Sequence, residues 1–417
     1  MIKPPPLRND CFALPAGVNW TPVDDALALL RDRLTPVTGT TAVRQTEAAG
    51  RVLADDILAV RSNPPQANSA VDGYGFAGAV AEGDHILPLC KGRAAAGVPF
   101  GGTVPAGSAL RILTGAALPA GVDTVILEED VTADAGQIAF RGPLKAGANA
   151  RKAGEDVAAG DLVLKAGRIL TPADVALLSA VGVGDVPVRD RLRVAVLSTG
   201  DEVVEPGTDA LPGQIFDANR PMLLTMLRVF GFDVVDMGRV PDNRAALRDR
   251  LDAAAEQGDA ILTSGGASAG EEDHVSALLH EAGAMQEWRI AVKPGRPLAL
   301  GLWRGKPVFG LPGNPVAAMV CTLVFARPAL GLLAGSGWQV PQGFDMPAAF
   351  EKRKKPGRRE YLRARVRNGR AEVFASEGSG RISGLSWAEG LVEIEDGERH
   401  IKPGDSVRFI PYGSFGL

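Results

Sequence analysis

The feature that most constrains the fold is a series of apolar runs that alternate with helical patterns between residues 191 and 335. The runs LRVAVLS, DVVDMG, DAILTS and KPVFGL are separated by PMLLTMLRVFG, DNRAALRDRLDAAAEQG and DHVSALLHEAG. Strands that are apolar along their length are buried on both faces, and strands joined through helices run parallel. The pattern therefore predicts a doubly wound α/β domain over 191–335, with a buried parallel sheet and helices on both faces.

The segments on either side of 191–335 have a different sequence pattern. A chain of 417 residues is also expected to form several domains. Residues 62–160 are punctuated by glycine and proline between short strand-like runs, which predicts an inserted β domain. Residues 1–61 and 161–190 each carry a Thr-Pro helix start, with Thr21 and Thr171 as expected N-caps, so we expect them to form one elongated N-terminal domain. Residues 336–417 predict a C-terminal β domain.

Charge and composition exclude several classes of protein. The net charge of −4 argues against a nucleic-acid-binding protein. The N-terminal residues MIKPPPLRND lack the apolar segment of a signal peptide, and no apolar run approaches eighteen residues. We therefore expect a cytoplasmic protein without membrane contact. The three cysteines and four histidines show no metal-ligand spacing.

Three expected strand ends in the α/β domain continue into small, polar, glycine-rich loops. Ligands of open parallel sheets bind beyond the carboxyl ends of the strands, and such loops let backbone N–H groups approach an anion. Caps and tight turns explain any single loop, but three in one sheet favour a phosphate-bearing ligand. The candidate binding residues are Ser198, Thr199, Gly200, Asp201, Ser264, Gly265, Gly266, Ser268, Gly270, Pro312, Gly313, Asn314 and Pro315.

Charged side chains near these loops suggest two further ligands. Asp201, Glu202 and Asp273 are hard oxygen donors of the kind that hold Mg²⁺ beside substrate phosphates. Lys293 and Arg296 flank a Pro-Gly turn, which by itself is better explained as a solvated turn. Arg363 lies with Tyr361 and Arg365 on one face of an expected strand, opposite Leu362 and Ala364. Converging cations favour an oxyanion as their partner.

The stretch QANSAVDGYGF, residues 66–76, shows no periodicity and follows Asn63-Pro64-Pro65. We expect an irregular loop around Asp72 and Gly73. By itself, the aspartate is better explained as part of an Asx-turn beside Gly73.

Taken together, the motifs resemble one family along roughly residues 20–415. They are NSAVDGYGF, ILTGAALPAG, GEDVAAGD, STGDEV, GQIFDANRPML, TSGGASAGEEDHV, KPGRPLALG and GLPGNPVAA. The sequence is similar to the molybdopterin molybdenumtransferases, the family of MoeA and the gephyrin E domain. The resemblance implies a MogA-like α/β molybdopterin-binding domain, an inserted β domain, an elongated helical/β domain and a C-terminal β-barrel-like domain.

The resemblance also implies an activity in molybdenum cofactor biosynthesis. Such a transferase inserts molybdate-derived molybdenum into adenylyl-molybdopterin, with Mg²⁺ as cofactor and AMP as product. The implied partners are a second copy of the chain in a homodimer and, transiently, the molybdopterin adenylyltransferase and acceptor molybdoenzymes. The implied site residues are Asp72, Thr114, Asp156 and Glu202 for catalysis; Lys293, Arg296, Arg363 and Ser379 for molybdate; and Asp201, Glu202, Asp242 and Asp273 for Mg²⁺.

Two alternatives stay open at this point. One is a non-catalytic molybdopterin carrier or scaffold protein, and the other is an enzyme acting on a different nucleotide pyrophosphate. Arg296 stands where the family frequently has lysine, so tungstate as well as molybdate remains open as the oxyanion.

Overall fold

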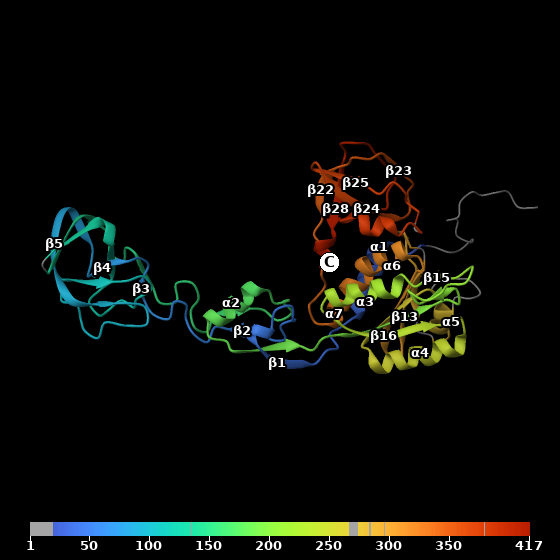
Figure 1. Cartoon of the computed structure of the whole chain (residues 1–417), viewed down its shortest axis with the longest axis horizontal. Helices are drawn as coiled ribbons and strands as arrows, with labels where there is room; N and C mark the ends of the chain where they lie inside the picture. The colour runs from blue at the N-terminus through green and yellow to red at the C-terminus, as the bar shows by residue number, and fades with distance from the viewer. Residues whose placement is uncertain (1–19, 135, 267–273, 283–284, 296, 379) are drawn as a thin grey trace, which may run out of the picture. The chain divides into compact units, whose positions relative to one another are not determined.

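The computed structural model describes residues 20–417 apart from 135, 267–273, 283–284, 296 and 379 (Figure 1). The chain divides into two compact units. The first unit contains the residues up to Thr40 together with Arg189–Leu417, and the second contains Thr41–Val188.

The first unit is built on a six-stranded sheet in the order β16-β13-β17-β21-β20-β18. Its strands are β13 (Arg193–Thr199), β16 (Asp233–Val240), β17 (Ala260–Ser264), β18 (Met285–Arg289), β20 (Pro297–Trp303) and β21 (Lys306–Leu311). The first four in spatial order run parallel, as predicted. Strand β20 pairs antiparallel with both β21 and β18, so the expectation of a parallel sheet is wrong at this edge. The turn between β20 and β21 consists of Arg304 and Gly305 alone, which is too short for the crossover that a parallel pair needs.

Helices cover both faces of this sheet, which confirms the doubly wound prediction. Alternate residues of β13 enter different cores: Val194 and Val196 join the core under α1, α3, α6 and α7, whereas Ala195 and Leu197 join the core under α4 and α5. The helices are α1 (Val23–Arg33), α3 (Asn219–Val229), α4 (Arg244–Gln257), α5 (His274–Glu281), α6 (Pro315–Cys321) and α7 (Arg327–Leu333). Helix α1 thus packs in the first unit, while the residue boundaries of the four expected domains stay predictions.

The start of α1 differs from the sequence prediction, and the start of α4 bears on a predicted cation ligand. Helix α1 has Pro22 rather than Thr21 at its N-cap, without a side-chain cap. Helix α4 is capped by Asn243, whose side chain accepts a hydrogen bond from a backbone N–H of the first turn, and not by Asp242. The carboxylate of Asp242 is therefore not used as a helix cap. The predicted cap at Thr171 is confirmed for α2 (Pro172–Ala180) and includes a reciprocal capping box.

Helices α6 and α7 are joined by a π-helical turn, Thr322–Ala326, into one continuous apolar helix. By length and composition the segment Pro315–Leu333 is able to cross a membrane, but 89% of its apolar window is buried inside the protein. The sequence analysis missed it because Arg327 and Pro328 interrupt the apolar run. A wider π turn accommodates a proline that has no N–H to donate. Arg327 donates to the carbonyl of Phe415 and covers the Phe230 ring, and burial lowers its pKa to about 10.

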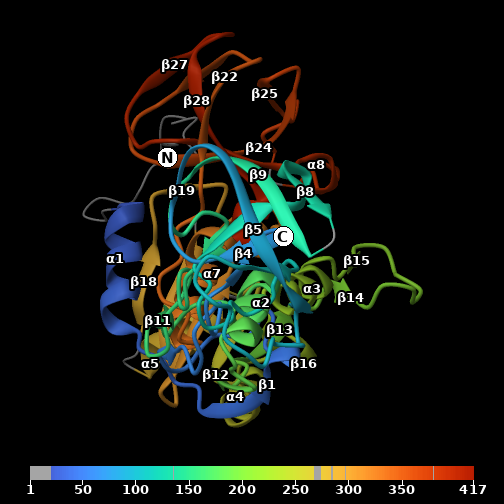
Figure 2. The ribbon, with the colours of Figure 1, turned by 90° about the vertical axis from the view of Figure 1, so that its left-hand side faces the viewer.

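The C-terminal residues form a second sheet in the first unit, in the order β19-β24-β26-β28-β22, with β25 paired to β24. Its strands are β19 (Val292–Lys293), β22 (Phe344–Pro347), β24 (Arg359–Arg367), β25 (Arg370–Val373), β26 (Gly390–Ile394) and β28 (Ser406–Pro411); β23 (Lys352–Lys354) pairs with β27 (Arg399–Ile401), and α8 spans Ser383–Trp387. Figure 2 shows these strands on the opposite side of the α/β domain from α4. Strand β19 comes from the α/β segment and pairs with β24, which joins the two sheets through Lys293 and Glu360.

Strand β24 has the two faces that the sequence predicts. Tyr361 packs into the core shared with the α/β domain, whereas Leu362 and Ala364 pack into the core of the C-terminal strands. Arg363 therefore lies on the face of β24 that is turned toward the α/β domain.

The second unit contains a six-stranded sheet in the order β7-β4-β6-β5-β9-β8. Its strands are β4 (Gly73–Phe76), β5 (Val80–Ala94), β6 (Ala109–Ile112), β7 (Thr124–Leu127), β8 (Val131–Asp134) and β9 (Gln137–Leu144). Smaller pairs join β1 (Thr40–Arg44) to β12 (Asp185–Arg189), β2 (Ile57–Leu58) to β11 (Leu162–Leu164) and β3 (Asn68–Ser69) to β10 (Ala150–Arg151).

The stretch around Asp72 is more regular than expected. Residues Gly73–Phe76 form β4, a fully buried strand between β6 and β7. The prediction of an irregular loop is therefore wrong from Gly73 onward, and Asp72 is the residue immediately before this strand. A Cβ at Gly73 would lie 1.8 Å from the carbonyl oxygen of Ile126, so glycine is what lets the strands approach so closely.

Candidate functional site

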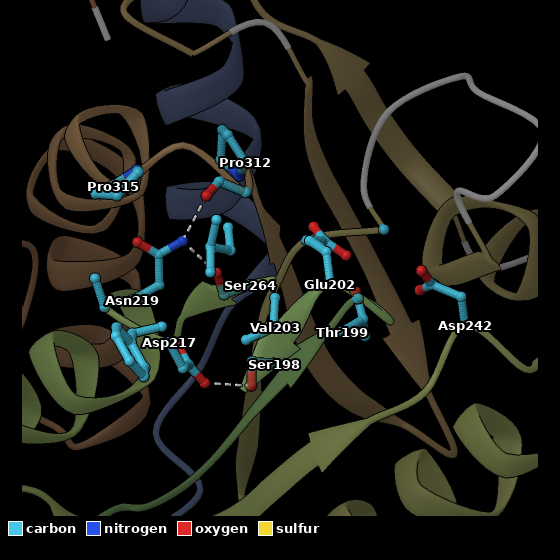
Figure 3. Close-up of a pocket in the computed structure, with 17 residues that line it drawn as sticks. Ser198, Thr199, Glu202, Val203, Asp217, Asn219, Asp242, Ser264, Pro312 and Pro315 are labelled. Carbon is cyan, nitrogen blue, oxygen red and sulfur yellow. Dashed lines mark hydrogen bonds between the residues drawn. The ribbon is translucent and has the colours of Figure 1, made fainter. Parts of the chain in front are cut away.

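A cavity of about 390 Å³ opens at the carboxyl ends of β13, β17 and β21 (Figure 3). The structure brings together most of the residues that the sequence predicts for a phosphate-bearing ligand. Those that line the cavity are Ser198, Thr199, Gly200, Ser264, Gly265, Gly266, Pro312, Gly313 and Pro315, and two predicted cation ligands, Glu202 and Asp242, line it as well. Asn314 does not line it and instead caps α6 through its side-chain oxygen. Ser268, Gly270 and Asp273 lie outside the described residues.

The cavity wall contains polar atoms that other described residues leave unsatisfied. Thr199 Oγ1 and Asn219 Oδ1 are buried and make no hydrogen bond within the described part of the chain. Buried polar atoms in native proteins are nearly always paired, so these two are available to a ligand. At Gly265, which has a φ of 92°, a Cβ would lie 2.8 Å from atoms of Thr199. Glycine is therefore required where β17 and β13 approach each other at the cavity floor.

Two residues of the wall, Asp217 and Asn219, were missed by the sequence analysis as site residues. Asp217 accepts a hydrogen bond from the hydroxyl of Ser198 over 2.6 Å. Asn219 donates to Ser264 Oγ and to the carbonyl of Gly313, both at 2.7 Å. Asn219 thus ties together the loops that follow β17 and β21. Their position in the GQIFDANRPML run, directly before the α3 pattern, was the available signal.

A buried arginine lies behind this wall. Arg220 donates through Nε to Asp217 and through one terminal nitrogen to both carboxylate oxygens of Asp236, at 2.7 and 2.6 Å. Its other terminal nitrogen pairs with Glu205, in the segment between β14 (Val203–Val204) and β15 (Ile215–Phe216). Because Asp217 also accepts the hydrogen bond from Ser198, Arg220 fixes the position of a carboxylate that orients a cavity-lining hydroxyl.

Three of the four carboxylates predicted to hold a cation lie at or beside this cavity. Asp201 and Asp242 exchange hydrogen bonds, each carboxylate accepting from the other's backbone N–H at 3.1 Å. Glu202 and Asp242 line the cavity, whereas Asp201 does not. Within the described ranges, no group of three or more Asp, Glu, His or Cys side chains is arranged to hold a metal ion by itself. Any cation here takes further ligands from a substrate or from residues not described.

A second cavity, of about 170 Å³, lies between the α/β segment and the C-terminal strands. Lys293 and Arg363 both line it, as does Lys352. The structure therefore brings together two of the four residues predicted to hold an oxyanion, and the other two, Arg296 and Ser379, lie outside the described residues.

Both predicted cations already have protein partners. Lys293 Nζ lies 2.8 Å from a carboxylate oxygen of Glu377 and 3.4 Å from one of Glu360. Arg363 is buried and donates to the backbone carbonyls of Ser376, Gly378 and Arg381. Its guanidinium organises the turn that follows β25, and burial lowers its pKa. The sequence predicted that Arg363 would be a cation of this cavity, but not that its guanidinium would donate to the backbone of the turn after β25.

The two cavities share a wall at the start of α6. Pro315 lines the first cavity and its neighbour Val316 lines the second. The turn that follows Lys293 packs on the same wall, since a Cβ at Gly295 would lie 3.6 Å from Pro312 Cγ. The cavity with the glycine-rich loops and the cavity with Lys293 and Arg363 are therefore adjacent in one unit.

The remaining predicted residues lie in the second unit. Asp72 Oδ1 accepts hydrogen bonds from the backbone N–H and the hydroxyl of Thr114, both at 2.6 Å. The Thr114 hydroxyl, followed by its N–H, holds the pKa of the Asp72 carboxyl below its usual range. Asp156 accepts a hydrogen bond from Asn63 at 3.0 Å, and the described contacts do not join it to Asp72. The structure pairs Asp72 with Thr114; the catalytic roles of all three residues stay predictions.

Comparison with known proteins places this architecture in a family. Residues 21–182 match the MoeA N-terminal region (domain I and II), 195–331 match a probable molybdopterin binding domain, and 345–412 match the MoeA C-terminal region (domain IV). The molybdopterin molybdenumtransferase of Haemophilus influenzae is 36% identical over 397 residues, covering 94% of this chain and 98% of that protein. Gephyrin of Dictyostelium discoideum is 28% identical, over 95% of this chain and 63% of that protein.

Comparison with solved structures supports the same family. The molybdopterin biosynthesis MoeA protein of Pyrococcus horikoshii OT3 superimposes with a TM-score of 0.83 at 29% identity, covering 94% of this chain and all of that chain. The fold and cavities define a multidomain protein with a molybdopterin-binding α/β domain. The chain belongs to the molybdopterin molybdenumtransferase family, and it is a transferase of molybdenum cofactor biosynthesis.

Proposed function

We propose that this chain catalyses the Mg²⁺-dependent insertion of molybdate-derived molybdenum into adenylyl-molybdopterin, with release of AMP. The observation that carries the proposal is the wall shared by the two cavities at the start of α6. One cavity has glycine-rich loops and carboxylates, and the other has lysine and arginine side chains. An enzyme that brings a phosphate-linked pterin to a metal oxyanion needs both environments side by side.

The first cavity suits the pterin pyrophosphate. Backbone N–H groups of the loops after β13 and β17 approach an anion without steric hindrance, since Gly200, Gly265 and Gly266 line the cavity. The unsatisfied oxygens of Thr199 and Asn219 add acceptors for N–H or O–H groups of the same ligand. Binding both substrates in neighbouring cavities lowers the entropic cost of their reaction.

The residues at the rim fit Mg²⁺. This ion is typically held by one or two carboxylates together with substrate phosphates, and Glu202 and Asp242 provide two carboxylates on the wall. These two residues would hold the ion, with Asp201 orienting Asp242 through their exchanged hydrogen bonds. The bound ion would polarise the phosphoanhydride of the substrate.

The chain's own side chains have separate tasks in this proposal. Lys293 attracts and orients molybdate in the second cavity, with Arg363 fixing the loop beside it. Asp72 is kept ionised by Thr114 and acts with Asp156 as a positioning carboxylate. We further propose that the protein works as a cytoplasmic homodimer, which light scattering after size-exclusion chromatography tests for its assembly.

The test is AMP release from adenylyl-molybdopterin, measured by chromatography with and without molybdate and Mg²⁺. We expect release only when both are present, and Glu202→Gln to lower the rate by about 100-fold as one metal ligand is lost. Glu398→Gln, a change of the same charge at an exposed residue outside both cavities, should leave the rate unchanged. Binding of the substrate without release of AMP would contradict the proposal and favour a carrier.

A further inference from the structure

The second cavity contains a carboxylate in the position where an anionic substrate is expected. Glu377 pairs with both lysines of the cavity: one of its oxygens lies 2.8 Å from Lys293 Nζ, and the other contacts Lys352 Nζ. Glu360 completes the cluster, at 3.4 Å from Lys293 and 3.0 Å from Lys352. Two ammonium groups thus face two carboxylates, and the four charges cancel.

The two carboxylates differ in how firmly they are held. Glu360 lies in the central part of the C-terminal sheet, on β24, and its side chain is 9% exposed. Glu377 lies in the turn between β25 and α8, and its side chain is 48% exposed. Rotation about its side-chain bonds moves its carboxylate into water without a change in the sheet. Glu377 is therefore the member of the cluster that an incoming anion is able to replace.

The backbone on both sides of Glu377 is fixed while its side chain is not. Arg363 donates to the carbonyls of Ser376 and Gly378, the two residues that flank it. The turn therefore stays in place when the Glu377 side chain leaves the lysines. Burial raises the pKa of the Glu377 carboxyl, but hydrogen bonds from Lys293 and Lys352 outweigh this effect and hold the pKa below its usual range. The group is an anion at neutral pH.

We propose that the Glu377 carboxylate is an internal substitute for the oxyanion: it occupies the place between Lys293 and Lys352, and a tetrahedral dianion binds by displacing it. This inference rests on the proposed function of the cavity as an oxyanion site. Its consequence is that Glu377 sets the affinity and selectivity of the cavity. A weakly charged or small anion gains too little from the lysines to displace the carboxylate, whereas a dianion with several acceptor oxygens pairs with both lysines at once.

The test measures binding of sodium molybdate to the full-length protein by isothermal titration calorimetry. Glu377→Gln keeps the size of the side chain and removes its charge, so the lysines lose a competing anion, and we expect Kd to fall by about tenfold. Selectivity should fall as well, with sulfate and phosphate gaining affinity. In turnover, KM for molybdate should fall while kcat does not rise.

Glu351→Gln is the matched control. Glu351 lines the same cavity and carries the same charge, but its carboxylate contacts His400 and neither lysine. The control should change Kd by less than about twofold, since a solvent-screened charge acts weakly at a distance. An equal effect of both substitutions would show that general charge, and not displacement of Glu377, controls binding, and would overturn the inference.

The outcomes separate this inference from the proposed function. If molybdate binds the unchanged protein and Glu377→Gln leaves Kd the same or raises it, the inference fails while the oxyanion site stands. If molybdate binds neither protein, both fail. If Glu377→Gln binds dianions more tightly but no AMP is released by either protein, the inference holds and the proposed reaction fails.

Discussion

Replacing Arg220 by methionine tests whether the charges behind the first cavity stabilise the fold. The Arg220 side chain is 7% exposed and pairs with Asp217, Asp236 and Glu205. Without the arginine, Asp236 and Glu205 rehydrate, because they are 41% and 54% exposed. Asp217 cannot rehydrate in the same way, because its side chain is only 3% exposed. A buried carboxylate that loses its cationic partner costs about 3 kcal/mol, and we expect the unfolding free energy to fall by this amount.

Arg193→Met is the comparison, since Arg193 also pairs with a carboxylate through two nitrogens. Its partner is Asp259, at 3.2 and 2.8 Å, but the arginine is 51% exposed, so we expect a loss of about 1 kcal/mol or less. The difference between the two variants isolates the effect of burial from the effect of removing an arginine.

Tryptophan fluorescence during urea unfolding measures both losses. All five tryptophans, at positions 20, 288, 303, 338 and 387, belong to the first unit, so the signal reports that unit alone. With a urea dependence of about 3 kcal/mol per molar, Arg220→Met should lower the midpoint by about 1 M and Arg193→Met by about 0.3 M. Equal shifts for the two variants would refute the argument from burial.

Three further predictions concern single residues. Thr114→Val removes the main cause of the low pKa of Asp72, so that pKa should rise and the acid limb of the AMP-release profile should move to higher pH; an unchanged limb would exclude Asp72 as the titrating group. Gly73→Ala would place a Cβ 1.8 Å from a backbone oxygen, so hydrogen exchange should speed up in β4 and its neighbours, whereas Gly101→Ala, with open space around it, should leave exchange unchanged. Burial raises the pKa of the Cys321 thiol to about 12, so iodoacetamide at pH 8 should label it, as judged by mass spectrometry, only after unfolding.

The sequence was sufficient for features that depend on local pattern. The apolar runs predicted the doubly wound sheet, because a strand buried on both faces must be apolar throughout. The alternation of Tyr361 and Leu362 predicted the two faces of β24 for a similar reason. The glycine-rich loops predicted the first cavity, since strand ends in one sheet gather at one edge.

Features that depend on distant partners were not predictable in this way. The partners of Lys293 lie 67 and 84 positions away, at Glu360 and Glu377, so its ion pairs have no local signal. Asn219 joins loops through Gly313, 94 positions further along the chain. The antiparallel edge of the sheet and the buried strand β4 likewise depend on pairing that composition does not encode.

The wall shared by the two cavities has a consequence for inhibitor design. A compound with a phosphate group for the loops after β13 and β17, linked to a small anionic head for Lys293, would make its second contact intramolecularly. With a linker matched to the distance between the cavities, the effective concentration of the second group is in the millimolar range. The linked compound should then bind about 100-fold more tightly than either fragment alone. The distance between the cavities is short because Gly295 lets the turn after Lys293 pack closely on α6, where a Cβ would lie 2.9 Å from the sulfur of Cys321.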